Sequence, residues 1–198
     1  MSYEDGISAL NLEAPERVPR TEYSVEGHWE VVGAVTGRSF DPESSWEYKH
    51  AAQKDLYTRW NYGLLWSTLI GGDDLGEWRT RMGHAEFAAE GADFSTRVES
   101  PFISVDQVLD FDPEAAIGAP DHGATVKRFE DHYRSQCEDY ADAVRMTGIY
   151  TTCVSGLIDL LGWDWLLLAA GTDPYRFGQL THRYNRWIRH FFEALAGA

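Results

Sequence analysis

The chain has 198 residues, a net charge of −15 and an apolar content of 43%. Its apolar content is typical of a globular protein, and its acidic balance disfavours binding to nucleic acid or to an anionic membrane, since both attract Lys and Arg. No apolar run reaches the roughly 20 residues of a membrane helix, and the acidic first residues do not predict a secretory signal. With only Cys137 and Cys153 and no CxxC pair, we expect a cytoplasmic protein without a disulfide framework.

The first 70 residues are predicted to hold two helices and two strands. Pro15 and Pro19 mark a bend between the first helix and the first strand. The segment Val25–Ser45 is rich in glycine and is expected to form a loop. The second strand is almost entirely apolar, as in strands buried on both faces of a parallel sheet. In chain order, the elements are a helix at Tyr3–Leu12, a strand at Val18–Ser24, a helix at Trp46–Trp60 and a strand at Gly63–Ile70.

The rest of the chain is predicted to contain one further strand among several helices. Residues 71–100 are polar and rich in glycine, and part of this segment is expected to form an antiparallel hairpin. The final helix keeps helical apolar spacing over about five turns. In chain order, the elements are hairpin strands at Trp78–Glu86 and Asp93–Val98, a helix at Val105–Leu109, a helix within 119–142, a strand at Ala143–Tyr150, helices at Thr151–Leu161 and Trp163–Ala170 with a break at Gly162, and a helix from Asp173 to Ala196.

The alternation of strands and helices predicts a parallel α/β architecture, because a parallel strand pair needs a crossover between its strands. Two folds of this class stay open on this evidence, the doubly wound sheet and the eight-stranded barrel. The first strand is not followed by GxGxxG, so the sequence does not predict a dinucleotide site of that kind.

Four segments of the chain follow the pattern of one known family. They are "ALNLEAPERVPR" (Ala9–Arg20), "YGLLWSTLI" (Tyr62–Ile70), "ESPFISVDQVLDFDP" (Glu99–Pro113) and "TGIYTTCVSGLIDLLGWDWLLLAAGTDP" (Thr147–Pro174). In this order they resemble the uroporphyrinogen decarboxylase superfamily, which includes porphyrinogen decarboxylases and corrinoid-linked methyltransferases. The resemblance implies a (β/α)8 TIM barrel with its site at the carboxyl ends of the strands.

The resemblance also implies that the barrel is incomplete in this chain. A closed barrel has eight strands, whereas three barrel-type strands are predicted here. We therefore expect residues 1–198 to be the N-terminal portion of such a domain, either cut from a longer protein or acting as a half-barrel that pairs with a partner chain. In the second case, self-association or association with another chain is expected at the open barrel edge beside the third strand.

The residues that decarboxylases of this family use are missing at the matching positions. The family's arginine pair after the first strand is matched by Ser24 and His28, its aspartate after the second strand by Thr68, and its tyrosine after the third strand by Ser155. An acidic chain without the arginine pair suits a substrate with many carboxylates poorly. Decarboxylation of a tetrapyrrole is therefore the second expectation.

Methyl transfer is the first expectation. The resemblance implies an enzyme that acts on a small methylated substrate with a corrinoid protein as its partner. In that branch, zinc held by His and Cys activates a thiol or presents the methyl acceptor. Its ligands lie in the second half of the barrel, so we expect no metal or cofactor site within this chain, and zinc and a corrinoid only in the complete protein. The alternative outside enzymes is a non-catalytic half-barrel.

Candidate catalytic residues lie at the end of the first predicted strand. Glu22 and Tyr23 end this strand, where barrel enzymes place catalytic groups. His28, in the following loop, is a candidate general acid or base. An ordinary loop carboxylate, a packed tyrosine and an exposed histidine explain the same pattern, and this alternative stays open.

Candidate substrate-binding residues are hydroxyl groups near strand ends and one compact basic cluster. Buried hydroxyls need partners that a ligand could supply, although backbone carbonyls serve as well. Two arginines on one face of a strand suit a carboxylate or phosphate, although surface ion pairs form the same pattern. The candidates are Ser24, Ser67, Thr68, Arg79, Arg81, Tyr150, Thr151 and Ser155.

Overall fold

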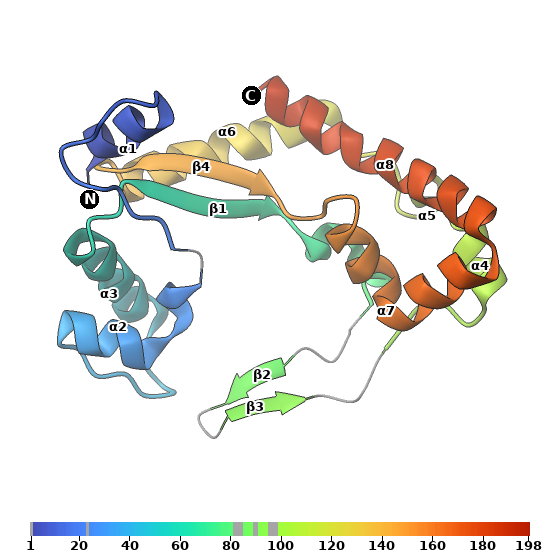
Figure 1. The fold of residues 1–198 in the computed structure, drawn as a ribbon, viewed down its shortest axis with the longest axis horizontal. Helices are drawn as coiled ribbons and strands as arrows, with labels where there is room; N and C mark the ends of the chain where they lie inside the picture. Colours follow the sequence, from blue (N-terminus) through green and yellow to red (C-terminus); the bar gives the residue numbers. More distant parts are fainter. Residues whose placement is uncertain (1, 23, 81–84, 89–90, 95–98) are drawn as a thin grey trace. The chain divides into compact units, whose positions relative to one another are not determined.

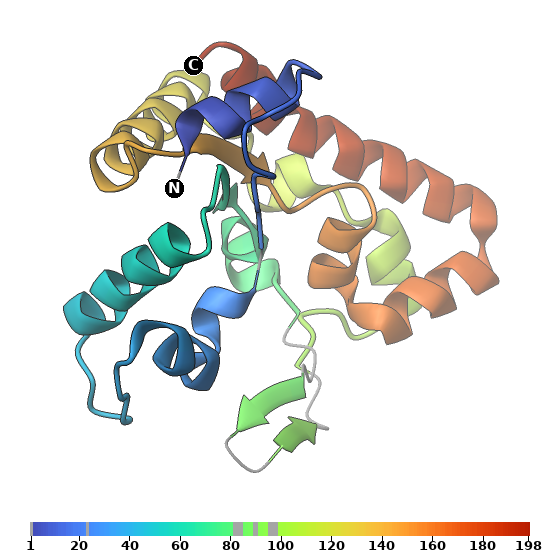
Figure 2. The same cartoon turned by 60° about the vertical axis from the view of Figure 1, so that its left-hand side comes forward.

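The computed structural model describes residues 2–22, 24–80, 85–88, 91–94 and 99–198 (Figures 1 and 2). The chain divides into two compact units. Unit 1 comprises Met1–Ser67 and Asp131–Gly148, and unit 2 comprises Thr68–Glu130 and Ile149–Ala198. The elements in chain order are α1 (Tyr3–Leu10), η1 (Val25–Gly27), α2 (Trp29–Thr36), α3 (Trp46–Arg59), β1 (Leu64–Ile70), η2 (Gly72–Trp78), β2 (Ala85–Ala88), β3 (Gly91–Phe94), α4 (Val105–Asp110), α5 (Pro113–Ala116), α6 (His122–Asp139), β4 (Val144–Ile149), α7 (Ser155–Thr172) and α8 (Pro174–Ala196).

The structure is mixed α/β and rich in helix, with β1 and β4 side by side in a two-stranded parallel sheet (Figure 1). The backbone N–H of Val144 donates to the Gly63 carbonyl at 2.9 Å. Beside Gly63, Arg20 forms an isolated parallel bridge with Tyr62. Three parallel segments therefore lie next to one another in their chain order. The predicted parallel α/β class is confirmed, and closure into a barrel stays a prediction.

Helix caps fix several elements where the sequence predicts them. The Ser45 hydroxyl accepts a hydrogen bond from the Tyr48 N–H, and the Ser104 hydroxyl accepts one from the Gln107 N–H, so α3 and α4 begin as expected. Asp173 caps α8, and Pro174 occupies the first turn, where its missing N–H costs nothing. The predicted helices α1, α3, α4 and α8 and strands β1 and β4 are confirmed, with small shifts at their ends.

The strand predicted at Val18–Ser24 is wrong. Among the described residues, this segment contributes the single bridge at Arg20 and then turns into η1. Val18 is 82% exposed, and Pro19 has no N–H for a ladder of hydrogen bonds. The segment therefore lacks both the burial and the donors of a regular strand.

The loop predicted over Val25–Ser45 is also wrong, since it contains η1 and α2. Val32 is fully buried and anchors α2 in the core of unit 1. Gly37 ends the helix with a φ of 76°, a left-handed conformation that glycine adopts readily. The glycines mark the end of a helix here, not a continuous loop.

Two predicted boundaries also change. The predicted hairpin is confirmed as the antiparallel pair β2 and β3, and Trp78 belongs to η2 instead of a strand. Residues 81–84 and 95–98 of the predicted strands lie outside the described residues. The helix predicted from Thr151 begins at Ser155, while the predicted break at Gly162 is confirmed by its φ of 71°. The short elements η2 and α5 were not predicted from the sequence.

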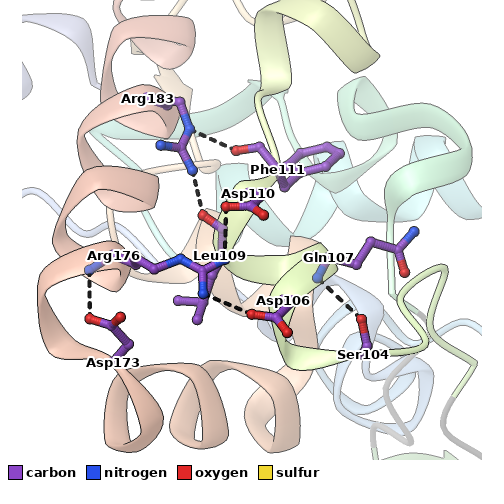
Figure 3. A network of polar contacts seen from close by, with 9 residues as sticks. All are labelled: Ser104, Asp106, Gln107, Leu109, Asp110, Phe111, Asp173, Arg176 and Arg183. Atoms are coloured by element: carbon purple, nitrogen blue, oxygen red, sulfur yellow. Dashed lines mark hydrogen bonds and ion pairs between the residues drawn. The ribbon is translucent and has the colours of Figure 1, made fainter.

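Helix α8 is fixed to α4 within unit 2 by arginines (Figure 3). Arg176 forms ion pairs with Asp106 and Asp110 at 2.7 and 2.8 Å. Arg183 donates to the carbonyls of Leu109 and Phe111 at 2.6 and 2.9 Å, and so satisfies acceptors at the carboxyl end of α4. The apolar stripe of α8 is buried in the core of this unit; its members are Leu180, Tyr184, Trp187, Ile188 and Phe191. Among the helices of the described residues, none is long and apolar enough to span a membrane.

Candidate functional site

In unit 1, a partly buried carboxyl group lies on η1. The Gln53 side chain on α3 donates to the backbone carbonyl of Glu26 at 3.1 Å and holds η1 against α3. Burial raises the pKa of Glu26, and the charge of Glu22 acts in the same direction. Its Oε2 atom is buried without a hydrogen-bond partner among the described residues. A carboxyl group with a raised pKa is a candidate proton donor, acceptor or ligand group.

Three tyrosines pack together in unit 1, and the charge of Glu26 adds to the effect of burial in raising the pKa of each. The Tyr57 ring centroid lies 4.8 Å from that of Tyr62 and 5.6 Å from that of Tyr140. Burial raises the pKa of Tyr62 to about 12, with the charges of Glu22 and Glu26 adding to the effect. Tyr62 is fully buried, and its hydroxyl has no partner among the described residues. These phenols stay neutral near pH 7 and act there as hydrogen-bond donors or aromatic surfaces.

The structure brings two of the predicted catalytic residues to this group. Glu22 and His28 are exposed, and the charges of both act on Glu26. Ser24 is exposed and precedes η1 without capping it through its side chain. Tyr23 lies outside the described residues. Glu26, which the sequence did not single out, is therefore the central carboxyl group of this cluster.

Ser67 in β1 has its hydrogen bonds supplied within unit 1. Its hydroxyl donates to the Met146 carbonyl at 3.2 Å and lies 2.8 Å from His132 Nε2. The Ser67 hydroxyl therefore has partners within the protein, which is the alternative to ligand binding that the sequence left open. Thr68, the neighbouring candidate, belongs to unit 2 and is exposed.

In unit 2, the turn after β4 uses most of its polar groups internally. The Tyr150 N–H donates to the Ile70 carbonyl at 2.8 Å. The Ser155 hydroxyl donates to the Tyr150 carbonyl and lies 2.7 Å from the Thr152 hydroxyl. Tyr150 is 50% exposed, so its side chain is accessible at this turn. Ser155 therefore shapes the turn through its hydroxyl.

Two hydroxyls beside this turn are buried and lack partners among the described residues. They belong to Thr151 and Tyr184, and both residues are fully buried. Gly156 leaves room for the Tyr184 hydroxyl at this turn, since a Cβ atom there would lie 1.8 Å from Tyr184 Oη and 3.0 Å from the Thr151 carbonyl carbon. Burial raises the pKa of Tyr184, and the nearby Asp159 adds to this effect. Such a pair of neutral hydroxyls can hold a buried water or a polar ligand atom.

The predicted basic cluster is described only in part. Arg79 is exposed and forms an ion pair with Asp73, whose carboxylate is almost fully exposed. The contact is therefore a surface ion pair, the alternative to binding a carboxylate or phosphate ligand that the sequence left open. Arg81 lies outside the described residues.

The sequence predicts the zinc ligands of the complete protein outside this chain. Among the described residues, no group of three or more His, Cys, Asp or Glu side chains could hold a metal ion. Cys137 and Cys153 are both free thiols.

Replacing Thr151 by valine is expected to leave the stability unchanged or to raise it by about 1 kcal/mol, because a buried hydroxyl without a partner costs desolvation energy. Replacing Ser155 by alanine is expected to lower the stability by about 1 kcal/mol, since its bond to the Tyr150 carbonyl is lost. Urea unfolding of the two variants checks this order. A larger loss in Thr151→Val would show that its hydroxyl has a partner, such as a buried water.

Comparisons with known proteins were made against family models, curated proteins and solved structures. No family model, no curated protein and no solved structure matches the chain.

Proposed function

We propose that the chain is the N-terminal portion of a barrel enzyme of the uroporphyrinogen decarboxylase superfamily that moves a methyl group from a small methylated substrate to a corrinoid protein. The four resembling segments suggest the family. The pairing of Arg79, Arg128, Arg176 and Arg183 with carboxylates and carbonyls is the observation that favours methyl transfer over decarboxylation.

The strand order supports the barrel part of this proposal. Arg20, β1 and β4 lie next to one another in chain order and run parallel. Successive strands of a (β/α)8 barrel have this order, and so do the strands within each half of a doubly wound sheet, which reverses its order only at its switch point. Helices α2 and α3 connect the first two segments, and α4, α5 and α6 precede β4.

The charges support a small substrate that is not a polyacid. In unit 2, Arg79, Arg128 and Arg176 form ion pairs with aspartates of the same unit, and Arg183 donates to backbone carbonyls. A tetrapyrrole with several carboxylates would have to break such pairs to find cationic partners. The two groups of unpartnered polar atoms instead offer a carboxyl group on Glu26 and neutral hydroxyls.

The chemistry of methyl transfer needs a bound and oriented substrate. A corrinoid on the partner protein would supply the methyl acceptor when bound. The residues of this chain would bind the substrate and exclude water.

Anaerobic titrations followed by tryptophan fluorescence test the proposal, because the chain carries eight Trp residues. Methylcobalamin is expected to quench the fluorescence saturably, and uroporphyrinogen is expected to have no saturable effect. Binding of uroporphyrinogen would support the decarboxylase alternative and overturn the proposal. Binding of neither compound would also overturn it and would favour the non-catalytic half-barrel.

A further inference from the structure

A cavity of about 340 Å³ lies within unit 2 and is lined by η2, α6, α8 and the segment that joins α5 to α6. Its volume lies near the lower end of the range of about 300–1,000 Å³ that is usual for small-molecule sites. Asp121 and Arg128 in its lining are exposed, so the cavity is open to solvent. A small ligand can therefore enter it without a rearrangement of the fold.

The buried side of this cavity is apolar. Trp187 and Phe191 on α8 line it, and they are 1% and 4% exposed. Their ring centroids lie 5.1 Å apart, and the Trp187 Nε1–H already donates to the Gly118 carbonyl at 2.9 Å. Ile117 and Pro120 add apolar surface from the connecting segment. This side of the cavity therefore suits an aliphatic or aromatic group of a ligand.

A guanidinium group and a carboxylate lie next to each other in the lining. Arg128 Nη1 on α6 lies 2.5 Å from Asp74 Oδ1 on η2, and Arg128 Nη2 donates to the Leu69 carbonyl at 2.9 Å. Because a guanidinium group has five N–H donors, these contacts leave donors for a ligand carboxylate. In the same unit, Arg176 pairs with two aspartates at once, so one arginine of this protein already holds two carboxylates.

The charges of the lining favour a ligand that carries both signs. Arg128 is the cation in this lining, and Asp74 and Asp121 are its carboxylates. A ligand with only a carboxylate would be repelled by both aspartates, and one with only an ammonium group would be repelled by Arg128. A zwitterion gives each of its charges an opposite partner, and it brings no net charge to a chain that carries −15.

We propose that this cavity binds a free α-amino acid with an apolar side chain. In such a molecule the ammonium group and the carboxylate are bonded to the same carbon atom, so their partners must lie side by side, as Arg128 and Asp74 do. Asp121 lies about two helical turns before Arg128 and accepts the Ala124 N–H at 2.7 Å, so we assign the ammonium group to Asp74. The side chain packs against the aromatic rings of α8. The inference goes beyond the proposed function and does not depend on it.

Calorimetry with four probes tests the inference. L-phenylalanine has both charges and an aromatic side chain. Each of the other probes lacks one of these features: 3-phenylpropanoate has no ammonium group, protonated 2-phenylethylamine has no carboxylate, and glycine has no side chain. The full chain is expected to bind L-phenylalanine at least about tenfold more tightly than each of the others. Failure to bind L-phenylalanine, or equal affinity for any of the other probes, would overturn the inference.

Three variants complete the test. Asp74→Asn is expected to weaken binding of L-phenylalanine by about tenfold or more but not that of 3-phenylpropanoate, because it removes a charge that attracts the ammonium group and repels the carboxylate. Ala124→Leu is expected to abolish binding by filling the cavity, since Ala124 lines it and leucine forms helix nearly as well as alanine. Asp110→Asn is the control, because Asp110 pairs with Arg176 and does not line the cavity, and it is expected to bind as the unaltered protein does.

Two results from these variants would overturn the inference. One is an unchanged affinity for L-phenylalanine in Asp74→Asn or in Ala124→Leu. The other is an equal weakening of both probes in Asp74→Asn, which would show that Asp74 acts only by holding Arg128 in place.

Discussion

Replacing Gly156 by alanine is expected to destabilise the protein by about 3 kcal/mol, because the added methyl group overfills a packed site. Its Cβ atom would lie 1.8 Å from Tyr184 Oη and 3.0 Å from the carbonyl carbon of Thr151. Tyr184 is fully buried on α8, so moving its ring aside would disturb the core of unit 2. Urea unfolding followed by circular dichroism measures the loss.

Two further variants identify the cause of this loss. Gly171 lies in the same helix, and no atom lies within 4 Å of a Cβ built there. Gly171→Ala is therefore expected to be neutral or to stabilise the protein by up to about 1 kcal/mol. Adding Tyr184→Phe to Gly156→Ala removes the closest atom and should recover part of the stability. Strictly additive losses in this double variant would contradict the contact.

Replacing Trp187 by alanine is expected to cost about 3–5 kcal/mol, the usual range for a large buried aromatic residue. Trp187 is 1% exposed, and its ring centroid lies 5.9 Å from that of Tyr184 and 5.1 Å from that of Phe191. Its Nε1–H also donates to the Gly118 carbonyl at 2.9 Å. The substitution would open a cavity and remove this bond, and thermal and urea unfolding would measure both effects together.

Trp163 provides the control for this prediction. It lies on α7 in the same unit and is 52% exposed. Its replacement by alanine is expected to change the stability by less than about 1 kcal/mol, because a half-exposed side chain leaves little cavity. Similar losses in the two variants would contradict the burial of the α8 stripe in unit 2.

Much of the fold could be predicted because local signals agree with the final packing. Helix α8 shows a sustained apolar stripe, an Asp cap and a proline in its first turn. The apolar run of β1 predicts the strand correctly, but the predicted burial on both faces is wrong, since Trp66 is 44% exposed and Thr68 is exposed as well. The signals conflict at α2, where Gly33 and Gly37 suggest a loop while Val32 becomes a core residue. The segment Val18–Ser24 is predicted to be a strand, but it does not form a regular one because Pro19 has no N–H to donate to a neighbouring strand.

The candidate sites could be predicted less well, because their main groups acquire their properties through tertiary contacts. Thr151 lies where the sequence pattern changes from that of a strand to that of a helix, and this position makes it a candidate. Tyr184 is distant in sequence and meets this turn only because Gly156 has no side chain. Glu26 lies in a segment that the sequence predicts to be a loop, and its burial depends on η1 packing against α3. Such burial leaves no local pattern in the sequence.

The ionisation of Glu26 also sets a pH dependence of stability. Burial raises its pKa above the ordinary value of 4.5. The native protein therefore keeps the proton where the unfolded chain has lost it, and the stabilisation is lost as the pH rises through the folded-state pKa. Glu26→Gln removes this titration and is expected to flatten the corresponding part of the stability curve.

A carbon NMR titration of the Glu26 carboxyl group tests the central claim most directly. Glutamate labelled at its carboxyl carbon reports the ionisation, and the spectrum of Glu26→Gln assigns the signal. The predicted result is a pKa above the ordinary 4.5, because burial of the carboxyl group on η1 disfavours its charged form. A pKa at or below the ordinary value would contradict this burial and the candidate site built around Glu26.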